Sequence, residues 1–404
     1  MIPEALKKDI SLKDLRLPRL GGGPSLKLPS FRGPHFRLTR KRSFRLAHHG
    51  DGDVVGLELE AGSVAVTQVH VNGSAQVTAA AVQPLAAGAF EDGEVRDPAA
   101  VTEALRELFE ANDLSRRVRL GIANQRVVVR TIRLPSIEDP GELDSAVRFA
   151  AQEEIPMPLE QAVLDHRVVG GVPASGDGPP QIDVIVVAAR RDMISASLKP
   201  LREAGLEPVG VDLSAFGMIR ALGELVPIYD QDAPADERPA ATGVLYCNVG
   251  DVTNLAIAKG RSCLFTRVSP TGLEDIVGSL IGSAGLLPEH ARQWVEYVGL
   301  ATPLEQLGGD PELVARVRAT LERGADALLG ELRLSLDFYG GQEAAVPVER
   351  IILSGPGSAI PGLAERMGAT LGLPVQSGLP SALAEFEPAL ASRLTLPFGI
   401  ALEE

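Results

Sequence analysis

The amino-acid sequence predicts an α/β protein built from two similar lobes. The chain has 404 residues, 45% of them hydrophobic, and this length exceeds what one hydrophobic core usually organises. Runs rich in β-branched residues alternate with amphipathic stretches, and one strand-turn-strand unit is written twice. Strand units and helices that recur in the same order are typical of two pseudo-equivalent α/β lobes.

The repeated unit reads VGLELEAGSVAVTQVHVNGSAQV at 55–77 and TGVLYCNVGDVTNLAIAKGRSCLFTRV at 242–268. Both copies alternate apolar and polar residues and turn at glycine, which predicts antiparallel hairpins. The turn glycines Gly73 and Gly260 hold equivalent places in the two copies. We therefore expect the two units to occupy equivalent positions in the two lobes.

The remaining elements follow from periodicity, Pro starts and β-branched runs. Helices are predicted within 97–114, 136–156, 191–206, 271–286, 288–300 and 311–341. Strands are predicted within 117–135 and 183–189, a strand and a helix within 207–225, and a strand, glycine-rich loop, helix and strand within 348–376. The Pro- and acid-rich stretch 227–240 is predicted to be a linker or an exposed loop.

Charge is distributed unevenly along the chain. Residues 1–50 carry 12 Lys/Arg and 3 Asp/Glu, whereas the whole chain has a formal net charge of −14. We expect this Pro- and Gly-rich basic arm to be disordered in isolation. It is interpreted as a solvated tail or, alternatively, as a contact for anionic lipid headgroups. A nucleic-acid arm is disfavoured, because the acidic body would repel a phosphate backbone.

Composition and motifs argue against several classes of protein. No apolar stretch approaches the roughly 18 residues needed to cross a bilayer, and the charged start lacks the apolar region of a secretory signal, so a cytoplasmic location is expected. Cys247 and Cys263 are expected to be small buried hydrophobes. Ser354 lacks a Gly-x-Ser-x-Gly elbow, and Glu153 and Glu154 are helical neighbours that point apart. The histidines show no metal spacing, so neither a metal site nor a catalytic residue is expected.

Two similar lobes that face each other leave a cleft at their junction. Tight turns near Gly62 and Gly250 can present backbone N–H groups to phosphates from opposite sides, and the SGPGSAIPGL loop can hold a base and a sugar. One glycine turn alone is a weak indication. The order of the three loops along the chain favours a nucleotide site more strongly.

Several longer motifs carry a family resemblance. They include RTIRLP, a Glu-Leu helix running into EEIPMP, FTRVSPTGLEDI, LRLSLDFY and IILSGPGSAIPGLAERMGATLGLPV. Over about residues 54–404 the chain resembles the actin-like proteins and, within them, the PilM proteins of type IV pilus assembly, more closely than the division protein FtsA. The resemblance implies an actin-like (ribonuclease H-like) two-lobed α/β fold with a duplicated β-hairpin/α unit and an inserted small α+β domain.

The resemblance and the repeat together divide the chain into expected domains. These are a basic disordered arm (1–50), the N-terminal segment of the first lobe (53–117), an inserted small α+β domain (118–207), a further segment of the first lobe with a linker (208–240), the second lobe (241–385) and a C-terminal return to the first lobe (386–404).

PilM-like proteins bind ATP in the cleft between their lobes, so the resemblance implies ATP with Mg²⁺ as the cofactor. The positions that match the family's nucleotide contacts lie at the two hairpin turns, in the helices that follow and in the third glycine loop. They are Glu58, Gly62, Ser63, Asn248, Gly250, Asp251, Thr253, Gly272, Arg292, Gly355, Gly357 and Ser358.

This chain departs from the family pattern at the cleft. The first phosphate loop has Glu58 and Glu60 where the family has Asp and Gly, and a carboxylate at Glu60 would stand near a polyphosphate. Two like charges about 4 Å apart cost on the order of 1 to 4 kcal/mol. Asn248 replaces an Asp that would help to hold Mg²⁺, Arg292 replaces a Glu, and Pro356 interrupts a run of glycines. These departures predict weak or vestigial ATP binding and no efficient ATPase activity.

The resemblance implies a scaffold at the inner face of the cell membrane. Such a scaffold recruits the cytoplasmic N-terminal peptide of a PilN-like single-pass inner-membrane protein and also contacts the pilus assembly ATPase. Two alternatives remain open at this stage. An actin-fold ATPase or kinase would need an intact first phosphate loop, and an FtsA-like filament protein usually carries a C-terminal amphipathic helix, whereas this sequence stops at GIALEE.

In the family, the partner peptide lies between the first lobe and the inserted domain, and it is apolar with a basic residue and a Pro. A matching surface needs apolar walls and a carboxylate. The expected partner-binding residues are Arg130, Phe149, Glu153, Glu154, Ile155, Met157 and Leu159. The alternative is that the apolar members of this set simply pack the core of the inserted domain.

Overall fold

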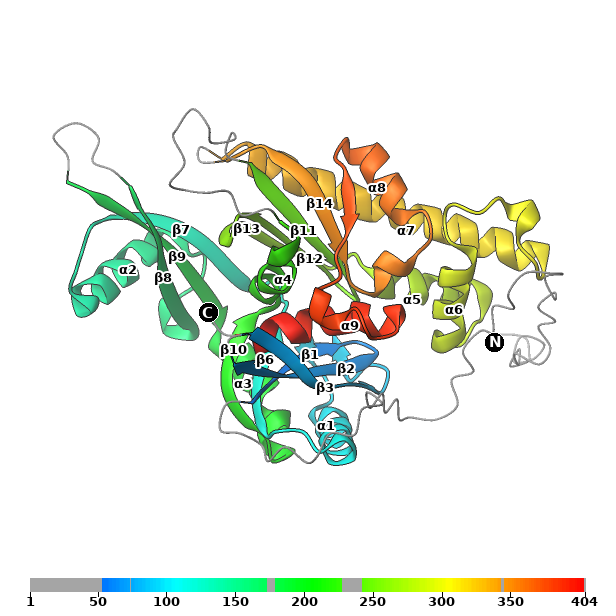
Figure 1. Ribbon diagram of the computed structural model, residues 1–404, viewed down its shortest axis with the longest axis horizontal. Helices are drawn as coiled ribbons and strands as arrows, with labels where there is room; N and C mark the ends of the chain where they lie inside the picture. The colour runs from blue at the N-terminus through cyan, green and yellow to red at the C-terminus, as the bar shows by residue number, and fades with distance from the viewer. Residues whose placement is uncertain (1–52, 73, 173–178, 227–241, 343–344, 403–404) are drawn as a thin grey trace.

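A computed structural model of the chain shows two sheet-containing lobes with helices α4 (Ser214–Leu222) and α9 (Pro388–Ala401) between them (Figure 1). A smaller sheet with helix α2 (Pro140–Glu154) projects at one side. The structure describes residues 53–72, 74–172, 179–226, 242–342 and 345–402. The predicted arm (1–50) and linker (227–240) lie outside the described residues.

The first sheet has the strand order β10-β6-β1-β2-β3. Its strands are β1 (Val54–Glu60), β2 (Ser63–Asn72), β3 (Ser74–Pro84), β6 (Arg117–Ile122) and β10 (Glu207–Leu213). Strands β1, β2 and β3 pair antiparallel, and β1, β6 and β10 pair parallel. The predicted hairpin unit at 55–77 therefore forms β1, β2 and the start of β3, the antiparallel part of this sheet.

The second sheet repeats the pattern of the first, with the strand order β13-β12-β11-β14-β15. Its strands are β11 (Gly243–Val249), β12 (Thr253–Lys259), β13 (Ser262–Ser269), β14 (Val348–Ser354) and β15 (Val375–Ser377). Strands β11, β12 and β13 pair antiparallel, and β11, β14 and β15 pair parallel. The repeat seen in the sequence is thus a repeat of sheet topology.

Helices α1 (Pro98–Asn112) and α3 (Arg191–Glu203) cover the first sheet. Helix α1 begins at Asp97, whose carboxylate accepts hydrogen bonds from two backbone N–H groups of the first turn. Such a cap stabilises a helix by about 1 kcal/mol. Leu105 of α1 and Leu201 of α3 are fully buried in one core with Leu57 of β1.

The second lobe is covered by helices that share one large core with their sheet. They are α5 (Leu273–Ala284), α6 (Pro288–Val298), α7 (Pro311–Gly340) and α8 (Leu363–Leu371). Cys247 and Cys263 are both buried, and burial raises the pKa of each thiol to about 12. Their predicted role as buried hydrophobes is confirmed.

The small domain consists of a sheet of order β7-β9-β8 with α2 on one face. Its strands are β7 (Val127–Pro135), β8 (Ala162–Val172) and β9 (Gln181–Arg190). The predicted bounds 118–207 are too wide for it, because β6 and the start of β10 pair in the first sheet and α3 packs in the first core. We propose 127–190 as the extent of this inserted domain, within a division into lobes that stays a prediction.

Helices α4 and α9 fill the space between the two sheets. Met218 of α4 and Leu394 of α9 share a core with Tyr246 of β11 and Ile352 of β14, and α9 also contacts β1 and β2. The backbones of α4 and α9 touch at Gly217 and Gly399.

The other short elements connect these layers. They are β4 (Phe90–Glu91), β5 (Glu94–Val95), η2 (Leu159–Gln161), η3 (Gly223–Leu225), η4 (Leu304–Gln306), η5 (Pro356–Ala359) and η6 (Ser381–Leu383). In the portion of the chain that the structure describes, no helix combines the length and the apolarity needed to cross a membrane.

Candidate functional site

The β1–β2 turn and the β11–β12 turn face each other between the lobes. A Cβ atom placed on Gly250 would lie 2.7 Å from Oε1 of Glu60, and a Cβ atom placed on Gly62 would lie 2.7 Å from Nη2 of Arg292. Each glycine therefore lets a charged side chain of the opposite lobe come close to the backbone. The two predicted phosphate loops meet, but side chains fill the space between them.

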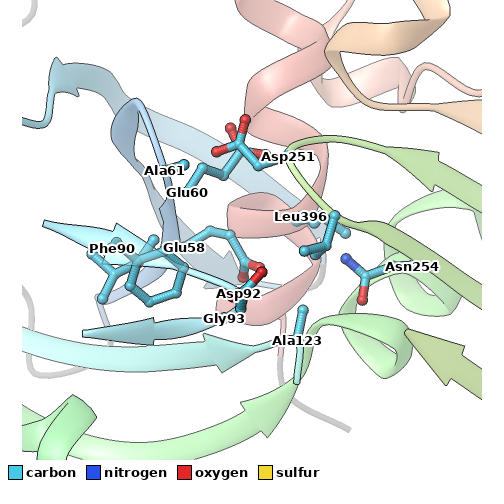
Figure 2. A pocket seen from close by; sticks show the side chains of 12 residues that line it. Glu58, Glu60, Ala61, Phe90, Asp92, Gly93, Ala123, Asp251, Asn254 and Leu396 are labelled. Atoms are coloured by element: carbon cyan, nitrogen blue, oxygen red, sulfur yellow. The ribbon is translucent and has the colours of Figure 1, made fainter. Parts of the chain in front are cut away.

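Glu60 is held at this junction by side chains from distant regions of the chain. Nη1 of Arg393, on α9, lies 3.3 Å from Oε2 of Glu60 and donates a second hydrogen bond of 3.4 Å to Oγ of Ser63. Figure 2 shows the carboxylates of Glu60 and Asp251 side by side across the gap. Arg292, on α6, pairs with Glu274 of α5 at 2.6 Å.

These surroundings change the acidity of Glu60. Burial and the neighbouring Asp251 raise the pKa of the Glu60 carboxyl to about 7, although the positive charges of Arg393 and Arg292 act in the opposite direction. We call Glu60, Arg393 and Arg292 the cleft latch, because Glu60 of the first lobe and Arg292 of the second each lie against the opposing turn.

Glu58 lies deeper, at the end of β1. It is only 5% exposed, and its carboxylate accepts hydrogen bonds of 2.7 and 2.9 Å from the hydroxyl of Ser214 at the start of α4. Burial raises the pKa of Glu58 to about 8, with smaller contributions from Glu60 and Asp212. The predicted phosphate-loop carboxylate is therefore a buried group turned toward α4.

The cavity beside these carboxylates has a volume of about 30 Å³. It is lined by Glu58, Leu59, Glu60, Ala61, Phe90, Asp92, Gly93, Ala123, Asp251, Val252, Asn254 and Leu396 (Figure 2). A volume of this size holds about one water molecule, whereas pockets for drug-sized ligands measure about 300 to 1,000 Å³. This cavity alone is too small to hold a nucleoside triphosphate.

The second-lobe residues of the predicted nucleotide site lie close together. Asn248 at the end of β11 donates a 3.2 Å hydrogen bond from Nδ2 to Oγ of Ser354. Gly355, with a φ of 82°, brings its backbone against Asn248, and Gly357 packs on Val249. Ser358 donates its hydroxyl hydrogen bond back to the carbonyl of Gly355 at 2.6 Å.

The turn after β11 is tied to the start of α5. Thr253 donates a 2.7 Å hydrogen bond to the backbone of Thr271, and Gly272 packs on the backbone of Gly250 and Asp251. Oδ2 of Asp251 and Oδ1 of Asn254 are buried and have no hydrogen-bond partner among the described residues. The predicted residues are thus brought together, while their role toward a nucleotide stays a prediction.

Among the residues that the structure describes, no group of three or more His, Cys, Asp and Glu side chains could hold a metal ion.

Three residues of the site were not anticipated as site residues. Arg393 holds Glu60, Glu274 holds Arg292, and Ser214 holds Glu58. Arg393 lies 333 positions from Glu60 in a stretch without a motif, so only the fold could bring it to the turn.

The predicted partner residues do not all lie at the surface. Phe149 on α2 is 72% exposed, whereas Ile155 is 4% exposed and packs in the core of the small domain. Met157 and Leu159 are partly buried against the same core. The Ile155 side chain is therefore used by the core of the small domain, and its contact with a partner stays a prediction.

The three polar members of the predicted partner set are exposed. Arg130 on β7 donates a hydrogen bond of 2.9 Å to the carbonyl of Val129. Glu153 and Glu154 lie in the last turn of α2. Glu153 follows Phe149 by four residues, which places the two on one face of the helix.

The topology and the paired turns place this chain in the class of two-lobed actin-like proteins. It is similar to a solved PilM-PilN type IV pilus biogenesis complex, with a TM-score of 0.69 and 26% identity over 86% of this chain and 97% of that chain. A sequence profile described as type IV pilus assembly protein PilM matches residues 56–395. The chain therefore belongs to the PilM family, and the predicted actin-like fold is confirmed.

Two further solved structures are more distant. The ethanolamine utilization protein EutJ from Carboxydothermus hydrogenoformans matches with a TM-score of 0.48 and 16% identity, over 86% of this chain and 88% of that chain. MreB 5 of Spiroplasma citri bound to AMPPNP matches with a TM-score of 0.45 and 11% identity, over 87% of this chain and 95% of that chain.

We expect stability to fall as pH rises through the pKa of Glu58. Between the ordinary value of 4.5 and about 8, the native protein keeps a proton on Glu58 that the unfolded chain has released. The free energy of unfolding then decreases with pH, and the loss is complete above about pH 8. Replacing Glu58 by Gln removes this pH dependence. From about pH 7 to about pH 9 the loss due to Glu58 is on the order of 1.4 kcal/mol, because about one pKa unit of the shift lies in that range.

Urea unfolding at about pH 7 and about pH 9 measures this effect. The pKa of Glu60 is raised to about 7, so deprotonation of Glu60 also lowers the free energy of unfolding as pH rises. Between about pH 7 and about pH 9, Glu58 contributes the larger part of the change, because its pKa is higher. Glu58→Gln is expected to flatten the change seen in the wild type. An equally steep change in both proteins would contradict a buried, protonated Glu58.

Proposed function

We propose that this protein is a scaffold of type IV pilus assembly that holds the cytoplasmic N-terminal segment of a PilN-like single-pass inner-membrane protein. The support is membership of the PilM family together with similarity to a PilM-PilN complex over most of both chains. Through such a partner, the protein would sit at the inner face of the cell membrane.

The surface of α2 fits such a partner segment. The Phe149 side chain is 72% exposed, and Glu153 follows one helical turn later. An exposed aromatic ring beside a carboxylate offers an apolar anchor and a partner for a basic residue. This combination matches an apolar peptide that carries one basic residue, the kind of segment that PilM-like proteins hold.

Nucleotide binding is proposed to be weak or vestigial. The cleft latch fills the space between the two phosphate loops, and the cavity beside it has a volume of about 30 Å³. This arrangement favours a scaffold over an actin-fold ATPase or kinase. The family match also favours it over an FtsA-like filament protein.

Two further contacts belong to the same proposal. The pilus assembly ATPase would bind the scaffold, and the basic arm (1–50), which lies outside the described residues, would touch anionic lipid. Cosedimentation of the full chain with anionic and with neutral vesicles tests the second contact. Equal recovery with both kinds of vesicle would count against it.

Fluorescence anisotropy with the labelled N-terminal peptide of the PilN-like partner tests the scaffold function. We expect saturable binding to the full chain and about tenfold weaker binding to Phe149→Ala, because truncating an interface aromatic side chain typically costs more than 1 kcal/mol. Phe338→Ala is the matched control, since Phe338 is a 63% exposed aromatic residue on α7. Absence of binding, or equal weakening by both variants, would overturn the proposed site.

A further inference from the structure

Strand β8 forms one margin of the small sheet. The sheet order is β7-β9-β8, and within the described residues β8 pairs with β9 alone. Among the described residues, no strand lies along the opposite edge of β8, where the backbone N–H of His166 donates a 2.8 Å hydrogen bond to Oδ1 of Asp165. Such an edge is a template for pairing with another strand.

Three valines of this edge strand are exposed, beside the exposed charged residues Asp165 and Arg167. Val163, Val168 and Val169 are 39%, 43% and 36% exposed. Natural edge strands are usually protected by charged residues, Pro or bulges. In β8 a β-bulge between Val168 and Gly170 interrupts the regular pairing with β9. The regular part of the edge strand is therefore short, and the bulge does not shield its outer edge.

The sequence of the open stretch is chemically symmetric about its centre. Residues 163–169 read VLDHRVV, with two apolar residues, an acid, a His, a base and two apolar residues. In an antiparallel pair of two copies centred on His166, Asp165 of one copy stands opposite Arg167 of the other. The twofold axis repeats this contact, so that two opposite-charge pairs form. Leu164 stands opposite Val168 of the second copy.

The faces of the strand agree with this pairing. Leu164 packs toward the core under α2, and alternation places Asp165 and Arg167 together on the other face, where both are exposed. Directly opposed residues of an antiparallel pair share a face, and opposite charges there are stabilising while like charges are not. Parallel pairing in register would set Asp165 against Asp165 of the second copy, and a shift by one residue would exchange the faces.

We infer that two copies of this chain associate through β8, antiparallel about His166, to join their small sheets into one continuous sheet. The contact is isologous, as is usual in homodimers. Because the paired stretch is short, the dimer is expected to be weak and dependent on concentration. If the proposed function holds, both α2 helices lie on the same face of the joined sheet, so that one dimer presents two partner segments side by side.

Charge reversal tests this pairing by sedimentation equilibrium of the full chain without any partner peptide. Asp165→Arg places two arginines opposite two arginines, and Arg167→Asp places acids opposite acids. Each single variant is expected to dissociate about tenfold more readily than the wild type. The double variant Asp165→Arg/Arg167→Asp restores opposite charges and is expected to dimerise again.

Mixing the two single variants provides a control for folding. Arginines at 165 and 167 of one chain then face acids at 167 and 165 of the other, so a heterodimer is expected where neither variant alone dimerises. Circular dichroism checks that each variant is folded. A wild type that sediments as a monomer up to its highest soluble concentration would overturn the inference, and so would a dimer that neither reversal weakens.

The register has its own test. Residues facing each other in an antiparallel pair have Cα atoms about 4.5 to 5.5 Å apart, within the range a disulfide spans. His166→Cys is therefore expected to cross-link two copies on mild oxidation, whereas Val163→Cys, whose own counterpart lies several residues away, is not. Cys247 and Cys263 are buried and do not compete. Equal cross-linking of both variants, or none of His166→Cys, would contradict the proposed register.

Discussion

Gly399→Val is expected to remove most of the free energy of unfolding of this protein. A Cβ atom on Gly399 would lie 2.5 Å from the carbonyl carbon of Gly217 and 3.0 Å from Cβ of Ala221. The first contact is with the backbone of α4, which cannot rotate away as a side chain can. Forced separation of α4 and α9 would open the core between the lobes, at a cost of about 4 kcal/mol or more.

A glycine without neighbours is the matched control for this substitution. Gly330 lies inside α7, and a Cβ atom there would meet no atom within 4 Å. Gly330→Ala is expected to stabilise the protein by about 0.5 to 1 kcal/mol, because glycine is a poor residue for a helix interior. Urea unfolding measures both variants. A loss in Gly399→Val no larger than about 1 kcal/mol would contradict the close crossing of α4 and α9.

Glu60→Gly is expected to strengthen Mg-ATP binding by one to three factors of ten. The substitution removes a carboxylate that lies against the opposite turn, and it frees Arg393 from its ion pair. Relief of charge repulsion on the order of 1 to 4 kcal/mol corresponds to this change in affinity. The added room also lets the two turns accept a polyphosphate between them.

Isothermal titration of the wild type and the variant measures this change. Glu305→Gly, an exposed change in η4, serves as a control for the loss of one negative charge. We expect the control to bind Mg-ATP as poorly as the wild type. Micromolar or tighter binding by the wild type, unchanged in Glu60→Gly, would show that the latch does not oppose nucleotide binding.

The fold could be predicted because its signals are local and occur twice. Alternation of apolar residues set the faces of the hairpin strands, and glycine set their turns, so that β1 to β3 and β11 to β13 were both expected as hairpins. The extent of the inserted domain could not be predicted in the same way. The pattern of α3 shows an apolar face but not its partner, and Leu201 packs with Leu105 in the first lobe.

The site was predictable only where its residues belong to a recognisable loop. Glu58 and Glu60 stand in the first phosphate loop, so both were expected near the cleft. The ion pair of Glu60 with Arg393 forms because α9 returns to the first lobe. The sequence around Arg393 contains no motif that predicts this contact. The apolar residue Ile155 was compatible with a partner-binding groove or with the core of the small domain. In the structure its side chain is buried in that core.

We propose that this PilM family member holds a partner segment while its cleft is closed by its own side chains. Titrating the full chain with the N-terminal peptide of the PilN-like partner, with and without Mg-ATP, tests it most directly. The same saturable binding is expected in both conditions, because the cleft latch takes the place of a nucleotide between the turns. Peptide binding that occurs only in the presence of Mg-ATP would contradict the account.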